Sequence, residues 1–377
     1  MQSQSFIDKI IFIGIIFLLV FAPLAFGSVH VWAYSAIQLG VFFLAGLWLV
    51  DRLIVSKTGT LTWVKTPLNL LMIILIGFIL FQTIPLPSSL LALLTPQTFA
   101  DKTVALKILS SAQDTGSAGI SWMPISYYIH PTMNELRKLI PYFCMFFIVL
   151  NTVKSKRQID ILIYTLIFVG LFEALYAIYQ VFSESPKVWW WQSRIGLHQY
   201  ASGTFIGSNH FAGYMEMTIC LTFGFLIAQG KKTNRMISNL GGAKEGVQRV
   251  VAWLSPESTR PQAVFLFVMG IIMAVALMMS ASRGGIISIS ISMLLMSVLF
   301  LFKKRYRKYA LLTLLLCVLA FFYALHLGID PTLEKFKKTE GLKSLLHISI
   351  TINPMDLDYP LTVVGWGKFK YLYPRYI

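Results

Sequence analysis

The chain has 377 residues, of which 56% are hydrophobic and only 13% are charged. Soluble domains contain about 45–50% apolar and about 25% charged residues, so this chain has too little polar surface to cover a globule of its size in water. The composition predicts a polytopic membrane protein, and it excludes a cytosolic enzyme, a secreted disulfide scaffold and a disordered tail. The net charge of +16 does not indicate a nucleic-acid partner here, because the basic residues lie mainly between apolar runs, as topology determinants do.

Apolar runs long enough to cross a bilayer predict an all-α bundle of about nine transmembrane helices. The predicted spans are 10–27, 32–50, 67–84, 138–153, 159–182, 204–229, 262–280, 284–302 and 309–328. The first span ends in Ala25-Phe26-Gly27, a weak signal-peptide cleavage pattern. Because a second apolar run follows almost at once, we expect an uncleaved span that pairs with the second.

The distribution of Lys and Arg predicts the orientation of the spans. More than half of these residues fall in 1–9, 51–66, 154–158, 230–261 and 303–308, which we assign to the cytoplasm together with the N-terminus. The outer face then carries a loop over 85–137, in which residues 86–94 predict a short amphipathic helix on the membrane surface. We expect a transmembrane domain over 1–328 and the beginning of a large, incomplete periplasmic loop over 329–377.

Two arginines are predicted to reach the same membrane face. Arg194 precedes the 204–229 span and Arg283 lies between the seventh and eighth spans, so two spans separate them whichever way the protein is oriented. Arg283 stands in Ser280-Ala-Ser-Arg-Gly-Gly285, which we interpret as a tight turn. Each arginine has two interpretations: bidentate binding of a phosphate, or an ordinary interfacial role against lipid headgroups, next to Trp189-Trp-Trp191 in the case of Arg194.

Polar residues also stand inside the apolar spans, where they are costly unless paired. Asn209 and His210 lie near the start of the 204–229 span, and Glu216 shares a helix face with Asn209 because the two are seven residues apart. We expect an interhelical hydrogen bond for Glu216, whereas Glu173 fits either a paired structural role or a functional one. His210 fits either a ligand or base, or a satisfied interfacial histidine.

Other chemistry has little support in the sequence. Cys144, Cys220 and Cys317 all lie in apolar stretches and are interpreted as small buried residues. No Walker loop, His-Glu-x-x-His motif or Gly-x-Ser-x-Gly elbow is present. Asp356 and Asp358 form a short Asp-x-Asp pair beside prolines, which is more typical of a turn than of a metal site. We therefore predict no metal and no cofactor.

Three segments together resemble the O-antigen ligase and O-antigen polymerase superfamily. They are Gly203-Thr-Phe-Ile-Gly-Ser-Asn-His-Phe-Ala212, Ser280-Ala-Ser-Arg283 and Asp358-Tyr-Pro-Leu-Thr-Val-Val-Gly-Trp-Gly-Lys-Phe369. A weaker similarity covers Phe21-Ala-Pro-Leu-Ala-Phe-Gly27. Each motif alone is modest, but their order and spacing make the set more specific, and it spans most of the chain.

The resemblance implies a GT-C-like fold in the bacterial inner membrane, with about a dozen helices and a large periplasmic loop that carries the active face. Members move a glycan from undecaprenyl diphosphate to an acceptor hydroxyl on lipid A-core, on a growing polysaccharide or on a protein. The family mechanism is metal-independent and inverting. Arg194 and Arg283 match its diphosphate-binding arginines. Candidate supporting residues are Asn209, His210 and Ser282. The histidine that serves as the general base in the family is expected beyond Ile377.

Two further hypotheses come from other classes of protein. A polytopic transporter or flippase of lipid-linked glycans would use the same basic groups as a binding path. A non-catalytic fragment would need a partner that supplies the histidine.

Overall fold

The computed structural model describes residues 6–55, 63–113, 122–183, 187–189, 192–193, 200–239 and 260–301. Within these residues five helices are long and apolar enough to cross a membrane. They cover Phe6–Leu24, Val31–Leu53, Lys156–Phe182, Ser208–Ala228 and Gln262–Met279, and two shorter apolar helices cover Pro67–Phe81 and Gly284–Leu299. The protein is therefore a mostly helical membrane protein, as its composition predicts.

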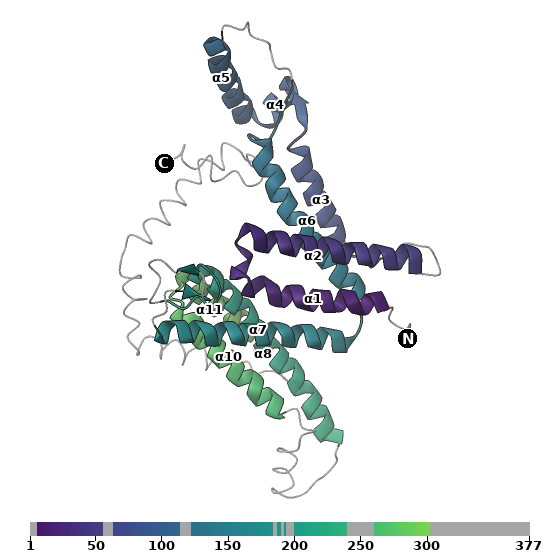
Figure 1. Ribbon diagram of the computed structural model, residues 1–377, viewed down its shortest axis with the longest axis vertical. Coiled ribbons are helices and arrows are strands. Elements are labelled where there is room, and N and C mark those ends of the chain that lie inside the picture. Colours follow the sequence, from purple (N-terminus) through teal and green to yellow (C-terminus); the bar gives the residue numbers. More distant parts are fainter. Residues whose placement is uncertain are drawn as a thin grey trace, which may run out of the picture. The chain divides into compact units, whose positions relative to one another are not determined.

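The order of elements follows the predicted spans closely (Figure 1). It is α1 Phe6–Leu24, η1 Phe26–Ser28, α2 Val31–Val50, η2 Asp51–Val55, α3 Pro67–Phe81, β1 Pro85–Pro87, α4 Ser88–Leu94, α5 Pro96–Gln113, β2 Trp122–Pro124, α6 Ile129–Thr152, α7 Lys156–Phe182, β3 Lys187–Val188, β4 Gln192–Ser193, α8 Ser208–Asn239, α10 Arg260–Met279 and α11 Arg283–Leu301. Each predicted span from 10–27 to 284–302 overlaps a helix, but in the part of the chain that the structure describes only five of these eight helices are long and apolar enough to cross a membrane. The span 309–328 and the tail 329–377 lie outside the described residues.

Helix α6 begins earlier than its apolar run predicts, at Ile129 instead of residue 138. Its first turns are polar, and the Lys138 ammonium lies 2.8 Å from the Glu135 carboxylate on this exposed surface. Pro141 lies inside the helix without ending it. The outer loop predicted over 85–137 is thus shorter at its C-terminal end, because a helix extends past its apolar part wherever polar side chains can be solvated.

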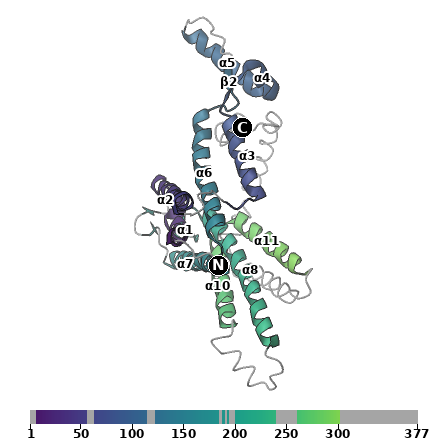
Figure 2. The ribbon, with the colours of Figure 1, turned by 90° about the vertical axis from the view of Figure 1, so that its right-hand side faces the viewer.

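The described residues divide into two compact units, which we treat separately. The larger unit contains residues 9–40 and those from 153 onward, and the smaller unit contains residues 6–8 and 41–152. In the larger unit α8 and α10 lie side by side, and both pack against α7 (Figures 1 and 2). In the smaller unit α3 packs against α6.

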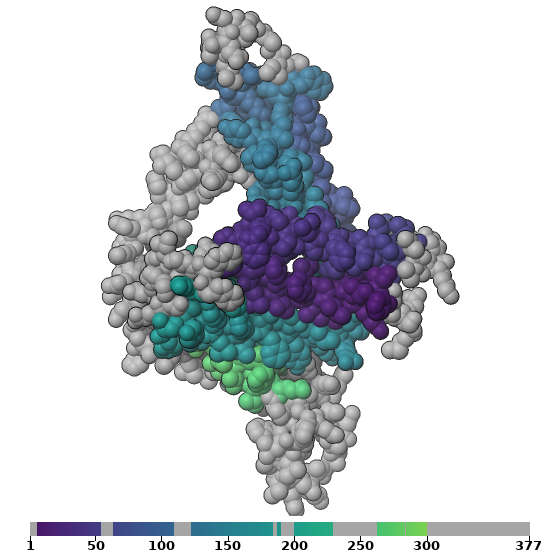
Figure 3. Space-filling model, in the orientation of Figure 1, coloured from purple at the N-terminus to yellow at the C-terminus, as the bar shows by residue number. Residues whose placement is uncertain are grey.

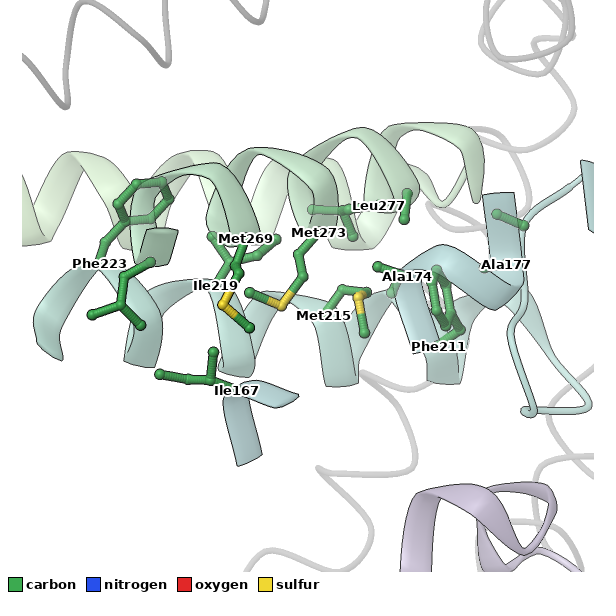
Figure 4. Close-up of a cluster of buried hydrophobic side chains, with 14 of the residues drawn as sticks. Ile167, Ala174, Ala177, Phe211, Met215, Ile219, Phe223, Met269, Met273 and Leu277 are labelled. Carbon is green, nitrogen blue, oxygen red and sulfur yellow. The ribbon is translucent and has the colours of Figure 1, made fainter. Parts of the chain in front are cut away.

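The core of the larger unit forms where α7, α8 and α10 meet. Met215 and Ile219 of α8, Met269 and Met273 of α10 and Ile167 of α7 belong to one cluster and are at most 1% exposed (Figure 4). Lipid tails are as apolar as these side chains, so close packing contributes more than the hydrophobic effect to the association of the helices.

The first two helices are paired in the larger unit, as the sequence predicts. The ring of Phe21 in α1 meets the edge of Trp32 in α2, with centroids 6.2 Å apart. Leu18 of α1 lies against Gly40 of α2. In Figure 3 the purple atoms of these two helices lie next to one another. The segment with the weak cleavage pattern forms the tight turn η1 between them.

The segment between α3 and α6 contains two short strands that the sequence does not predict. Strands β1 and β2 pair antiparallel, with Leu86 opposite Met123. The predicted helix at 86–94 begins only at Ser88, because Leu86 and the two prolines around it are extended. Leu91 of α4 is fully buried in a small cluster with Leu86, Met123 and Ile125.

Candidate functional site

Three turns that are distant in the sequence lie together at one end of the larger unit. They are η1, the loop that leads into α8, and the turn that joins α10 to α11. The Thr204 hydroxyl in the loop lies 2.7 Å from the carbonyl oxygen of Pro23, just before η1. The N–H of Ala201 donates to the carbonyl of Met279 over 2.9 Å. The loop before α8 is therefore bonded to the ends of both α1 and α10.

The backbone at this end adopts unusual conformations. Phe26, Ser28 and Ala281 all have positive φ, at 57°, 57° and 50°. A non-glycine residue in this region costs about 1–3 kcal/mol and persists only where the surroundings enforce it. Such residues concentrate at functional sites, so the strain singles out this end of the unit as the candidate site.

The hairpin β3–β4 joins the same cluster. The indole N–H of Trp189 donates to the carbonyl of Leu24 over 3.1 Å, and its backbone N–H donates to the hydroxyl of Tyr176 over 2.6 Å. The Trp189 and Tyr176 rings also stack, with centroids 5.3 Å apart. Arg194 follows β4 directly in the sequence and lies outside the described residues.

The predicted tight turn at 280–285 is confirmed, and it begins α11. Arg283 is the first residue of that helix, and its backbone, but not its side chain, is among the described atoms. Ser282 is 5% exposed, and its hydroxyl accepts a hydrogen bond from the N–H of Gly285 over 3.3 Å, as a helix cap does. Ser282, a candidate supporting residue, thus has a structural task in shaping the turn.

Asn209 and His210 lie in the first turn of α8, and both are exposed. The starts of α8 and α11 are adjacent, because Gly285 lies so close to Ala212 that an added Cβ would be 2.7 Å from the alanine methyl. The structure therefore brings the beginnings of these two helices together, with Asn209 and His210 on one and Arg283 on the other. The open surface around the two polar residues is compatible with a ligand.

Deeper in the bundle, the two carboxyl groups have the partners expected from the sequence. Glu216 Oε1 accepts hydrogen bonds from the hydroxyls of Ser288 and Ser292 on α11, over 2.5 and 3.3 Å. This confirms the predicted interhelical bond. Glu173 is fully buried and bonded to Thr204.

Gln180 is a further polar residue of the site, and the sequence pattern alone does not predict it. Its amide donates to the carbonyl of Gly203 over 2.9 Å, and it is fully buried. Gln180 stands seven residues after Glu173, so both are on one face of α7. Two polar residues at this spacing in an apolar helix are the signal that would have revealed the shared face.

The fold and composition define a helical membrane protein with one polar, conformationally strained end. Searches against family models, curated proteins and solved structures gave no match for this chain. Among the described residues, no three His, Cys, Asp or Glu side chains cluster in a way that would hold a metal ion. The site itself and the resemblance of its motifs are therefore what indicates a function for this protein.

Proposed function

We propose that this protein is a glycosyltransferase of the O-antigen ligase and polymerase class in the bacterial inner membrane. Its donor is a glycan linked to undecaprenyl diphosphate, and its acceptor is a hydroxyl of lipid A-core, of a growing polysaccharide or of a protein. In this proposal the N-terminus is cytoplasmic, the strained end of the larger unit faces the periplasm, and the helices follow a GT-C-like arrangement.

One observation carries the proposal. Three of the segments with the family resemblance, 21–27, 203–212 and 280–283, are separated by long stretches of chain, yet contacts made by them or by residues next to them join them at one end of the larger unit. The fourth, 358–369, lies outside the described residues. Motifs that only secured helix packing would have no reason to gather at one end. Their convergence supports a common site at which Arg283, Asn209 and His210 meet one substrate.

The proposed reaction forms a bond between the acceptor oxygen and the anomeric carbon of the donor. The bond between that carbon and the diphosphate oxygen breaks, and undecaprenyl diphosphate leaves with the electron pair. The acceptor proton passes to a general base, a role that we assign to no residue of the described chain. Negative charge grows on the leaving diphosphate, so the guanidinium groups of Arg194 and Arg283 would stabilise the transition state.

The test compares Arg283→Ala with Arg157→Ala in proteoliposomes. Arg157 is an exposed arginine near the start of α7, so it controls for the loss of a charge. The substrates are a fluorescent undecaprenyl-diphosphate-linked glycan and, in separate assays, lipid A-core, excess lipid-linked glycan or an acceptor protein. We expect Arg283→Ala to reduce transfer about 100-fold or more, the usual cost of losing a group that stabilises an oxyanion.

The control variant should transfer at the unaltered rate. Transfer by Arg283→Ala at the rate of the unaltered chain would contradict the role of that arginine. Movement of the labelled lipid across the bilayer without transfer to any acceptor would favour a flippase instead.

A further inference from the structure

Glu173 is a carboxyl group in the middle of an apolar, membrane-spanning helix. Its side chain is fully buried. Among the described residues, no Lys, Arg or His lies within ion-pair distance of it. A buried carboxyl without a cationic partner is costly in a helix of this kind and persists where it has a specific task.

The contacts of Glu173 are concentrated on one residue. Its Oε2 atom accepts the backbone N–H of Thr204 over 2.9 Å, and its Oε1 atom lies 2.6 Å from the Thr204 hydroxyl. The same hydroxyl lies 2.7 Å from the carbonyl oxygen of Pro23. A hydrogen-bonded chain thus leads from α7 through the loop before α8 to the end of α1.

The surroundings of Gly203 show that the residues of this hydrogen-bonded chain are closely packed. It has a φ of +55°, and an added Cβ would collide with the Glu173 carboxylate and approach the Phe211 ring to 3.1 Å. Gln180 holds the Gly203 carbonyl from the next part of the same helix face. Two side chains of α7 therefore fix the peptide group between Gly203 and Thr204, Gln180 at its carbonyl and Glu173 at its N–H, a few residues before α8 begins at Ser208.

We propose that Glu173 is a positioning residue for the glycosyl transfer. By fixing Thr204 against α7 and α1, it sets the place and direction of the first turn of α8, which carries Asn209 and His210 beside the start of α11. This inference rests on the proposed function for its activity readout, but its geometric claim is independent of the substrate.

The proposal requires hydrogen bonds at position 173 but not a negative charge. In Glu173→Gln, the amide oxygen can accept the Thr204 N–H, and the amide N–H can donate to the Thr204 hydroxyl, which then donates to Pro23. Glu173→Met has a similar volume but leaves the buried N–H of Thr204 without its partner. Displacement of a reacting geometry by about 1 Å costs about 100-fold in rate.

We therefore expect Glu173→Gln to transfer glycan within about threefold of the unaltered chain and Glu173→Met to lose about 100-fold. The matched control is Glu216→Met, which removes a carboxyl from α8 that bonds only to Ser288 and Ser292 in the described contacts. It should cost less than a tenth of the Glu173→Met effect. Equal losses in Glu173→Gln and Glu173→Met, or none in Glu173→Met, would overturn the proposal.

A second readout does not depend on activity. Asn209→Cys is introduced into the full chain after its three native cysteines are replaced by alanine, and labelling by a membrane-impermeant maleimide is timed. Adding Glu173→Met should change the labelling rate at position 209 at least fivefold, whereas adding Glu173→Gln should not.

These two readouts separate the hypotheses. A labelling change without any glycan transfer by the unaltered chain would contradict the proposed function while leaving Glu173 as the residue that positions α8. An unchanged labelling rate in Glu173→Met would contradict the positioning role even in an active transferase.

Discussion

The segment between α3 and α6 in the smaller unit satisfies its buried polar groups differently from the turns at the end of the larger unit. In the smaller unit, Lys102 donates to the carbonyls of Pro124 and Ser126, and Tyr127 donates to Asp101. These partners are within 26 residues of one another, and the segment between α3 and α6 closes on itself. In the larger unit, by contrast, the Thr204 hydroxyl reaches a residue 181 positions away.

This difference separates stability from function. Bonds between near neighbours order a loop at little entropic cost and require no particular global arrangement. Bonds between distant segments fix helix ends relative to one another, and here they do so beneath the exposed residues Asn209 and His210. The larger unit is therefore the one in which small displacements should affect chemistry, whereas changes in the 85–128 segment should affect local stability alone.

The largest effect is expected for Gly203→Val. A β-branched residue would be strained at a φ of +55°, and its Cβ would collide with the Glu173 carboxylate. Strain and overpacking together should lower the free energy of unfolding by about 3 kcal/mol, measured by SDS titration in mixed micelles. Gly224→Val on α8 is the matched control, because a Cβ there meets nothing within 4 Å. Equal stability of the two variants would show that the Gly203 turn is not tightly fitted.

The sequence predicts the helices of this protein better than its site. Apolar runs locate the apolar parts of the long helices, since bilayer thickness sets their length. They do not predict α5, the polar first turns of α6 or the last turns of α8. The turn at 280–285 is also predictable, because an uninterrupted run would be twice as long as a span. The extended residues around Leu86 are not, because their pairing with Met123 depends on contacts across a loop.

For the site, the sequence identifies residue types but not partners. The spacing of Asn209 and Glu216 predicts a shared helix face, and the structure adds Ser288 and Ser292 as the partners of Glu216. The bond from Thr204 to Pro23 has no local signature, because hydroxyl residues are common in spans and usually bond within their own helix. Long-range partners of this kind come only from tertiary packing.

A smaller effect, confined to the other unit, is expected for the pH dependence of the 85–128 segment. Burial lowers the pKa of the Lys102 ammonium from 10.5 to about 8. Between these pH values the unfolded segment binds more protons than the folded one, so the stability of the segment should rise as the pH rises from 8 to 10.5. Lys102→Met should remove that dependence.

The opening of this segment is measured by thiol labelling of Thr98→Cys. Thr98 is fully buried in α5, and its hydroxyl has no partner among the described residues, so the replacement is mild. This labelling rate is divided by the rate for the same thiol in the Lys102→Met background, so that the intrinsic pH dependence of the labelling reaction cancels. A ratio of labelling rates that stays constant from pH 8 to 10.5 would contradict the lowered pKa of Lys102. A change in glycan transfer by Lys102→Met would show that the 85–128 segment affects more than local stability.

The smallest effect is expected within the larger unit, at the bonds between α8 and α11. Ser288→Ala removes the hydroxyl 2.5 Å from Glu216, and Ser292→Ala removes the one at 3.3 Å. Hydrogen bonds between membrane helices contribute about 0.6 kcal/mol on average, so Ser288→Ala should cost about that and Ser292→Ala less. Ser290→Ala is the control, because within the described residues this exposed hydroxyl bonds to the carbonyl of Ile286 in its own helix and to no other helix. A loss of more than about 2 kcal/mol in the free energy of unfolding of Ser288→Ala would mean that Glu216 also supports the site. The polar side chains that position the site would then lie on α8 as well as on α7.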